Sequence, residues 1–164
     1  MDGKLRNMTG LYLRKGDKLL LLYRIGSSVI ADSYTASAGG HFEKEELNDA
    51  KACVLRELYE ETGLTENDIA NLSLRYVAIR LKNGELRQNY YFFADLIAEE
   101  KEITSEEGNL KWFSLRELLE TPPEMPFSAL YAVKHYAEIG KDTDAVYVGA
   151  ATESGITFTE MKEF

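Results

Sequence analysis

The sequence predicts a single α/β domain in which helices pack against a mixed β-sheet. Strand-like runs and helical patterns follow one another without the regular strand–helix alternation of a parallel sheet. The 164 residues suffice for one hydrophobic core, so residues 1–164 are expected to form one domain. Apolar residues make up 45% and charged residues 29%, as in ordinary globular proteins.

Local signals place the individual elements. Asn83-Gly84 between two β-rich runs is a strong hairpin signal, and Gly63 stands where a helix ends with a positive φ. Ser114 is a helix-capping residue, and Thr152–Gly155 is the turn of a possible terminal hairpin within a C-terminal segment, 126–164. In chain order the expected elements are strands at Met8–Arg14 and Lys18–Tyr23, a loop at Gly26–Ala38, a helix from a cap at Asn48 or Asp49 to about Thr62, strands at Leu72–Lys82, Glu85–Leu96 and Leu110–Phe113, and helices at Leu115–Leu119 and Phe127–Ile139.

Charge and cysteine content narrow the function classes. A net charge of −9 argues against a nucleic-acid or anionic-membrane binder, which needs a basic face. Phosphate binding would then need a metal ion or a local Arg/Lys cluster. The single cysteine, Cys53, excludes an intramolecular disulfide and is interpreted as a buried packing thiol. No apolar run reaches the ~18–20 residues of a membrane span, and the N-terminus has no apolar signal core, so a cytoplasmic protein is expected.

Three glutamates crowd one side of the first predicted helix. At ~100° per residue, Glu57, Glu60 and Glu61 fall within one arc, and Ala52, Leu55, Leu58 and Tyr59 on the other side are expected to anchor the helix to a sheet. Like charges four residues apart cost roughly 0.2–0.5 kcal/mol, and the helix dipole disfavours anions near its C-terminus. A solvated acidic face in an unrelated α/β scaffold is the plain alternative.

A hard divalent cation would compensate this repulsion. Mg²⁺ takes carboxylate oxygens, waters and substrate phosphate, and a backbone carbonyl of Gly39-Gly40 can approach closely because glycine has no Cβ. No histidine or cysteine lies among these positions, which argues against zinc. Arg56 can orient Glu60 through an ion pair four residues apart.

These residues resemble the Nudix box. Its second half is complete as Arg56-Glu57-Leu58-Tyr59-Glu60-Glu61-Thr62-Gly63-Leu64. In the first half Gly40 and Glu46 match, but nine residues rather than seven separate Glu46 from Arg56. The role of the family's first glutamate therefore falls to Glu43, Glu46 or Asn48. The resemblance extends over about Met8–Leu119, because residues 105–118 (SEEGNLKWFSLREL) also look like a family segment.

The resemblance implies a fold, a reaction and a set of roles. The fold would be a Nudix-type α/β/α sandwich around a mixed sheet, with the box as a loop–helix–loop motif. The reaction would be hydrolysis of a pyrophosphate bond in a nucleoside diphosphate derivative, with Mg²⁺ or Mn²⁺ as cofactor. Glu57, Glu60 and Glu61 would be metal ligands beside the Gly40 carbonyl, with Glu57 the first choice for general base. A second acidic residue would come from Glu106 or, as the chosen catalytic candidate, Glu107.

The substrate is less closely defined. Arg24 and His41 are candidates to contact phosphate, and Arg80 and Tyr90 lie on the long hairpin, although a surface charge or a core aromatic are the plain alternatives. The compact chain resembles the MutT-like branch, which implies an oxidised (deoxy)nucleoside triphosphate such as 8-oxo-dGTP. Nucleotide sugars, dinucleoside polyphosphates and capped RNA stay open. A small-molecule nucleotide is the expected partner, and the C-terminal segment could form a homodimer surface or close over the pocket. The alternative function is a nucleotide-sensing, non-catalytic module of the same fold.

Overall fold

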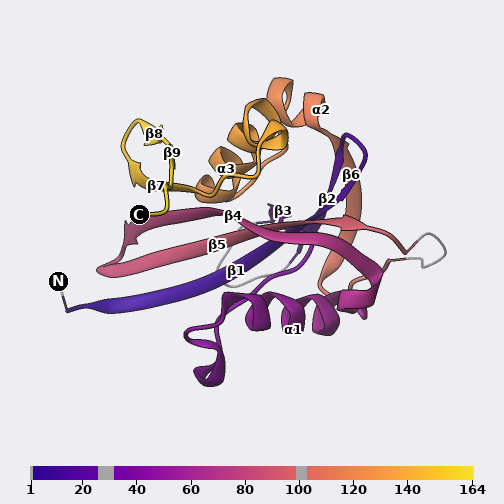
Figure 1. Ribbon diagram of the computed structural model, residues 1–164, viewed down its shortest axis with the longest axis horizontal. Coiled ribbons are helices and arrows are strands. Elements are labelled where there is room, and N and C mark those ends of the chain that lie inside the picture. Colours follow the sequence, from indigo (N-terminus) through magenta and orange to yellow (C-terminus); the bar gives the residue numbers. More distant parts are fainter. Residues whose placement is uncertain (1, 26–31, 99–102) are drawn as a thin grey trace.

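A mixed β-sheet separates two helical layers (Figure 1). The structure is a computed structural model that describes residues 2–25, 32–98 and 103–164. The strands are β1 (Lys4–Lys15), β2 (Lys18–Arg24), β3 (Ser33–Thr35), β4 (Ile69–Lys82), β5 (Glu85–Leu96), β6 (Gly108–Ser114), β7 (Tyr147–Thr152), β8 (Gly155–Ile156) and β9 (Thr159–Glu160). The helices are α1 (Ala50–Thr62), α2 (Leu115–Glu120) and α3 (Phe127–Glu138), with short 3₁₀ turns η1 (Lys44–Glu46), η2 (Glu66–Asp68) and η3 (Gly140–Asp142).

The sheet mixes parallel and antiparallel pairs, as expected. Its order is β3-β2-β1-β5-β4-β7-β8, with β6 beside β2 and β9 beside β7. β1 runs parallel to β5, and β4 runs parallel to β7, while β4 and β5 form the predicted antiparallel hairpin. Asn83 and Gly84 both have positive φ, 54° and 74°, which is the backbone of a tight hairpin turn.

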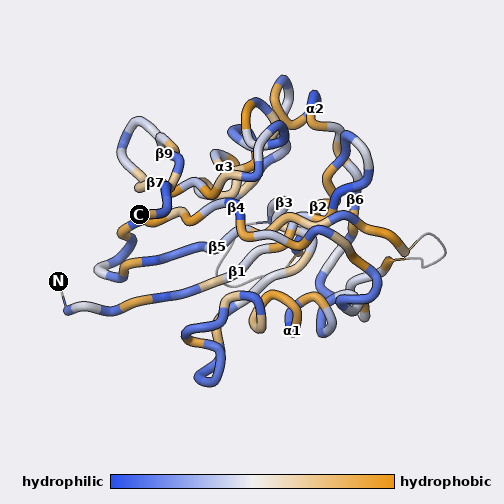
Figure 2. Tube along the Cα trace, in the orientation of Figure 1, coloured by the Kyte–Doolittle hydropathy of each residue, from blue (hydrophilic) through white to orange (hydrophobic). Residues whose placement is uncertain are grey.

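Alternation along the strands builds one core on each face of the sheet. Tyr12, Tyr76 and Phe93 point toward α2 and α3, whereas Leu11, Leu13 and Phe92 point toward α1. The layers lie on opposite sides of the sheet in Figure 1, and Figure 2 shows mostly hydrophobic residues where the strands run between them. The predicted α/β/α sandwich is therefore confirmed.

Of two further expectations, the loop before the double glycine is partly wrong and the terminal hairpin is confirmed. The predicted loop at 26–38 is wrong at β3, because Ser33–Thr35 pairs with β2, and a pairing of that kind is set by tertiary contacts; residues 26–31 lie outside the described residues. The terminal hairpin is confirmed, since β7 pairs antiparallel with β8. None of the helices in the described ranges is long and apolar enough to cross a membrane.

Candidate active site

A cavity of about 1130 Å³ opens on the face of the sheet where β1 meets the Gly39-Gly40 segment. It extends past the end of β2 and over β4 and β5 to the start of α3. Of the residues predicted from sequence, it is lined by Arg24, Gly40, His41, Glu57, Glu61 and Arg80. Arg56, Glu106 and Glu107 also reach it.

Helix α1 turns two of its carboxylates inward. The Asp49 side chain caps the helix by accepting a hydrogen bond from the backbone N–H of Ala52, and Gly63 ends it with φ 70°. The residues buried along α1 are Cys53, Val54 and Leu58. Glu57 comes three residues after Val54, and Glu61 comes three after Leu58, so both lie on the same side of the helix as the buried residues. Their side chains are only 12% and 8% exposed.

The orientation expected for α1 is wrong in two positions. Ala52 is exposed and Tyr59 is 62% exposed, so neither anchors the helix to the sheet. Leu58 does so, and Cys53 is buried as expected, with a pKa that burial raises to about 11. Glu57 and Glu61 therefore lie on the side of the helix that faces the sheet, where their carboxylates are largely shielded from water.

The double glycine allows the chain to pass between β1 and the carboxylates. Gly39 has φ 154°, and a Cβ there would lie 2.3 Å from the carbonyl oxygen of Thr9. The Gly39 N–H donates to Glu61 Oε2 at 2.9 Å. A Cβ on Gly40 would lie 2.3 Å from Glu57 Oε1, so the carboxylate rests directly on the glycine backbone. The Gly40 carbonyl accepts from the Thr9 N–H at 2.8 Å, which leaves it one lone pair.

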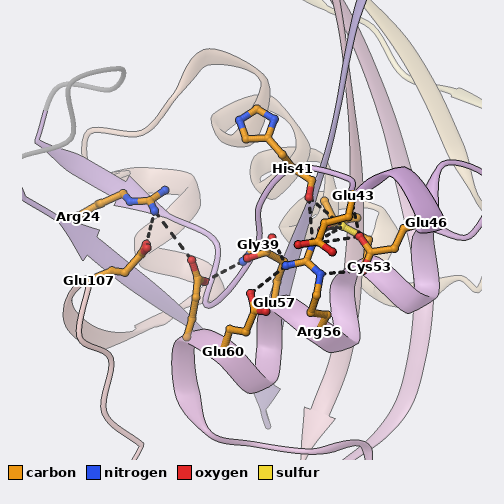
Figure 3. Close-up of polar contacts among 12 residues, drawn as sticks. Arg24, Gly39, His41, Glu43, Glu46, Cys53, Arg56, Glu57, Glu60 and Glu107 are labelled. Atoms are coloured by element: carbon orange, nitrogen blue, oxygen red, sulfur yellow. Dashed lines mark hydrogen bonds and ion pairs between the residues drawn. The ribbon is translucent and has the colours of Figure 1, made fainter.

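Arg56 joins the box glutamates into one network (Figure 3). Its guanidinium donates to Glu46 Oε1 and Oε2 at 2.7 and 3.0 Å, to Glu57 Oε1 at 2.9 Å and to Glu60 Oε2 at 2.8 Å. It also donates to the His41 carbonyl at 3.0 Å. These bonds to Arg56 lower the pKa of Glu46 to about 2.

The hydrogen bonds of Arg56 distinguish among the three candidates for the first glutamate of the box. Glu46 is buried and holds Arg56 by a two-pronged pair, despite the two extra residues in the loop. Glu43 supports it, because its backbone N–H donates to Glu46 Oε2 at 3.0 Å. Asn48 is exposed. Of the three alternatives, Glu46 is the one whose carboxylate contacts Arg56 in the described structure.

Negative charge accumulates at the cavity wall. Burial raises the pKa of Glu57, and the charges of Glu60 and Glu107 add to the rise. Burial also raises the pKa of Glu61 well above its usual range, with Glu107 beside it. Arg24 pairs with Glu107 and lies 3.9 Å from Glu61 Oε1, which only partly offsets the repulsion.

The donor set fits a hard divalent cation. Glu57 and Glu61 offer partly dry carboxylates on one wall, and oxygen ligands of this kind suit Mg²⁺ or Mn²⁺. In the part of the chain that the structure describes, no three acidic, histidine or cysteine side chains converge tightly enough to form a complete metal-binding group. The Glu60 side chain is 53% exposed and paired with Arg56.

The predicted substrate residues divide between the two faces of the sheet. The His41 ring lies beside Arg6, with His41 Nε2 and Arg6 Nη2 2.6 Å apart. Tyr90 corrects the sequence expectation: it packs on Phe42 at 5.4 Å between ring centroids and belongs to the core on the α1 side. Because strand residues alternate, its neighbour Tyr91 lines the cavity instead.

The sequence analysis named Arg80 but missed the other members of a group of polar residues in the same cavity. The side-chain atoms that are buried without a hydrogen-bond partner in the described ranges are Arg6 Nε, Tyr12 Oη, Ser33 Oγ, Arg80 Nε and Ser128 Oγ. All of these residues line the cavity. Once the strand pairing is known, the register shows that Arg6 and Arg80 point to the same face of the sheet. No local sequence pattern identifies Ser33 and Ser128 as cavity residues. Buried polar groups are normally paired, so this collection indicates a polar ligand.

Comparisons with known proteins agree with this geometry. The model of the family described as NUDIX domain matches residues 4–135. No curated protein matches the chain by sequence. Among solved structures, a MutT protein from Bacillus halodurans has a TM-score of 0.63 and 23% identity over 94% of this chain and 97% of that one. A MutT NUDIX hydrolase from Burkholderia pseudomallei has 0.63 and 22% over 80% and 97%, and an Ap4A hydrolase from C. elegans has 0.61 and 17% over 84% and 99%. The chain therefore belongs to the NUDIX domain family.

Proposed function

We propose that the chain catalyses Mg²⁺- or Mn²⁺-dependent hydrolysis of a pyrophosphate bond in a nucleoside diphosphate derivative. The observation that carries the proposal is the pair of inward carboxylates, Glu57 and Glu61, beside the Gly39-Gly40 backbone. Their repulsion has no structural use, since helices of globular proteins ordinarily bury apolar groups on that stripe. Unfavourable placement of this kind is expected where a ligand compensates it.

Each residue of the network has a role in this reaction. When bound, the divalent cation supplies neutralisation of phosphate charge, an in-line template and acidification of the attacking water. Glu57, Glu60, Glu61 and the free lone pair of the Gly40 carbonyl would hold it, with Glu60 first released from Arg56. Arg56 positions Glu57 and is itself held by Glu46.

A general base must be a carboxylate that lies close to the substrate and whose charge is not fully neutralised by neighbouring cations. Glu57, where it is the member of the cluster left unligated by the cation, is our choice of general base, because burial raises its pKa and it lines the cavity. Glu107 is the second candidate. It lines the same cavity from the segment before β6 and is paired with Arg24.

The rest of the cavity would bind the nucleotide. Arg24, His41 and Arg80 line it, and Tyr12, Ser33 and Ser128 bring unpaired hydroxyls that can bond a base or sugar. The resemblance to the MutT-like branch, a name that two of the neighbours carry, motivates an oxidised (deoxy)nucleoside triphosphate such as 8-oxo-dGTP as substrate. The name of the Ap4A hydrolase neighbour motivates a dinucleoside polyphosphate as the other candidate. A cytoplasmic location and a homodimer through the C-terminal segment remain predictions, to be tested by fractionation and sedimentation.

Product release from a nucleotide panel tests the proposal. We expect Mg²⁺-dependent turnover by the wild type, and a loss of at least about a hundredfold in kcat for Glu57→Gln, as for other groups that act on the transition state. Glu66→Gln is the matched control, because Glu66 is an exposed glutamate paired only with Lys51 in the described structure. Absence of metal-dependent turnover on every diphosphate compound would refute the proposal. Tight nucleotide binding without turnover would favour the non-catalytic sensing module instead.

A further inference from the structure

A row of arginines crosses three neighbouring strands on the cavity face. Arg6 on β1 lies opposite Arg87 on β5, and Arg87 lies opposite Arg80 on β4. Residues directly opposite in paired strands point to the same face of a sheet, and all three side chains line the cavity. The row spans two interstrand spacings, or ~10 Å. Lys82, two residues beyond Arg80, also lines the cavity.

The protein leaves much of this charge without a partner. In the described ranges Glu85 is the carboxylate that pairs with the row, at 2.8 Å from Arg87 Nε and 3.9 Å from Arg6 Nη1. Arg80 makes no ion pair or hydrogen bond within those ranges, and its Nε, like that of Arg6, is buried without a partner. Burial, together with the neighbouring Arg87 and Arg6, lowers the pKa of Arg80.

A purely structural role does not account for this arrangement. A buried donor without an acceptor destabilises the fold, and more so when it is charged. The chain carries 28 acidic residues, yet among the described residues Glu85 is the one carboxylate that forms ion pairs with the row. The donors are therefore available to an anion from outside, and guanidinium groups match the geometry of phosphate by two-pronged hydrogen bonding.

The row lies apart from the catalytic carboxylates. His41 follows Gly40 and pairs with Met8 in a β-bridge, and Arg6 stands two residues, or ~7 Å, further along β1. Figure 2 shows that β5 becomes hydrophilic toward this outer end. An anion at the row is thus held beyond His41, separate from one that rests against Glu57 and Glu61.

We propose that Arg6, Arg80 and Arg87 bind a second phosphate of the substrate, beyond the diphosphate that is cleaved. The inference rests on the proposed function and narrows it to substrates with additional phosphate. That phosphate is either a phosphomonoester on the nucleoside or part of a longer polyphosphate chain. The chemistry of recognition is the same for both sources.

Binding measurements without turnover test the row directly. In EDTA, titration calorimetry compares two matched pairs of adenosine compounds. ADP-ribose against its 2′-phosphate reports a phosphomonoester, and diadenosine diphosphate against diadenosine tetraphosphate reports a longer chain. In at least one pair we expect the compound with more phosphate to bind about tenfold more tightly or better. Equal affinity within both pairs would overturn the proposal, and this result needs no variant.

Variants then assign the preference to the row. Arg80→Ala should reduce the ratio of the two affinities by about tenfold, and Arg80→Lys should restore part of it. Arg116→Ala is the matched control, since Arg116 is exposed and paired with Glu120 on α2. A preference that survives in Arg80→Ala, or that falls equally in Arg116→Ala, would contradict the assignment. Phosphate-selective binding without Mg²⁺-dependent hydrolysis would refute the proposed function alone, and hydrolysis without the preference would refute the row alone.

Discussion

Replacing Gly40 by alanine tests whether the glycine exists to seat the Glu57 carboxylate. The added Cβ would lie 2.3 Å from Glu57 Oε1 and 2.5 Å from its Cδ, whereas ordinary contact begins at 3.4 Å. The backbone of Gly40 has no positive φ, so alanine itself is not strained there. The clash must therefore be relieved by the Glu57 carboxylate, which has to move by ~1 Å. A catalytic group misplaced by ~1 Å typically costs about a hundredfold in rate, which is ~2.7 kcal/mol of transition-state stabilisation.

Steady-state kinetics and thermal unfolding separate this effect from damage to the fold. We expect kcat/KM of Gly40→Ala to fall about a hundredfold, with a melting temperature within a few degrees of the wild type, because the atoms displaced end a flexible side chain. Gly16→Ala is the control, since its Cβ would meet nothing within 4 Å although φ is 59°. It should change stability at most, and leave kcat/KM unchanged. Wild-type kinetics in Gly40→Ala would refute the seating of Glu57 on this glycine.

Further predictions concern the Arg56 network and the C-terminal layer. Arg56→Lys keeps the charge but loses the two-pronged bond to Glu46, so we expect kcat to fall about tenfold or more in the same assay, with KM changing less. Arg75→Met removes a buried guanidinium that donates to carbonyls of the segment after α3, and urea unfolding should show a loss of ~3 kcal/mol or more, compared with a negligible change for Arg116→Met. Burial lowers the pKa of His135, so the unfolded chain takes up a proton at higher pH than the native one. The free energy of unfolding should therefore fall as pH drops below ~6.5, and His135→Gln should lose that part of the slope; identical slopes would contradict the assignment.

Local signals in the sequence were enough for the elements that carry the site. The Asp49 cap, the left-handed Gly63 and the Asn83-Gly84 turn each act within a few residues, so their patterns translate directly into structure. The carboxylate motif was similarly predictable, because helical spacing fixes the angles between Glu57 and its neighbours.

The facing of α1 could not be predicted in the same way. Spacing gives angles between residues of one helix, but the side that meets the sheet depends on what the sheet presents. Here the Gly39-Gly40 segment runs along β1 and places polar backbone next to α1. The Gly39 N–H donates to Glu61, and the Glu57 carboxylate lies against Gly40, so both carboxylates can face inward. Of the side expected to face the sheet, Leu58 is buried, whereas Tyr59 is left in solvent.

Loop length was a poor guide to the role of Glu46. The two extra residues leave the role of the family's first glutamate open among Glu43, Glu46 and Asn48. They lie after Glu46, in the turn that leads into α1, where the Asp49 N–H donates to the Glu46 carbonyl at 2.7 Å. The Glu46 carboxylate still reaches Arg56, because a turn closed by such a bond takes up residues with little net advance.

The net charge explains why one cavity contains both an acidic wall and a basic row. At −9 the chain as a whole repels polyphosphates, so they bind only where local positive charge prevails. At the α1 end the wall carries the carboxyl groups of Glu57 and Glu61, so we propose that positive charge arrives there with a divalent cation. At the strand end it is built from side chains, Arg6 and Arg80 among them. Under the two proposals, phosphate is bound at one end through a cation that promotes cleavage and held at the other by guanidinium groups. We therefore expect a substrate with phosphate at both ends to be oriented by the two sites, and the bond nearest α1 to be the one that is cut.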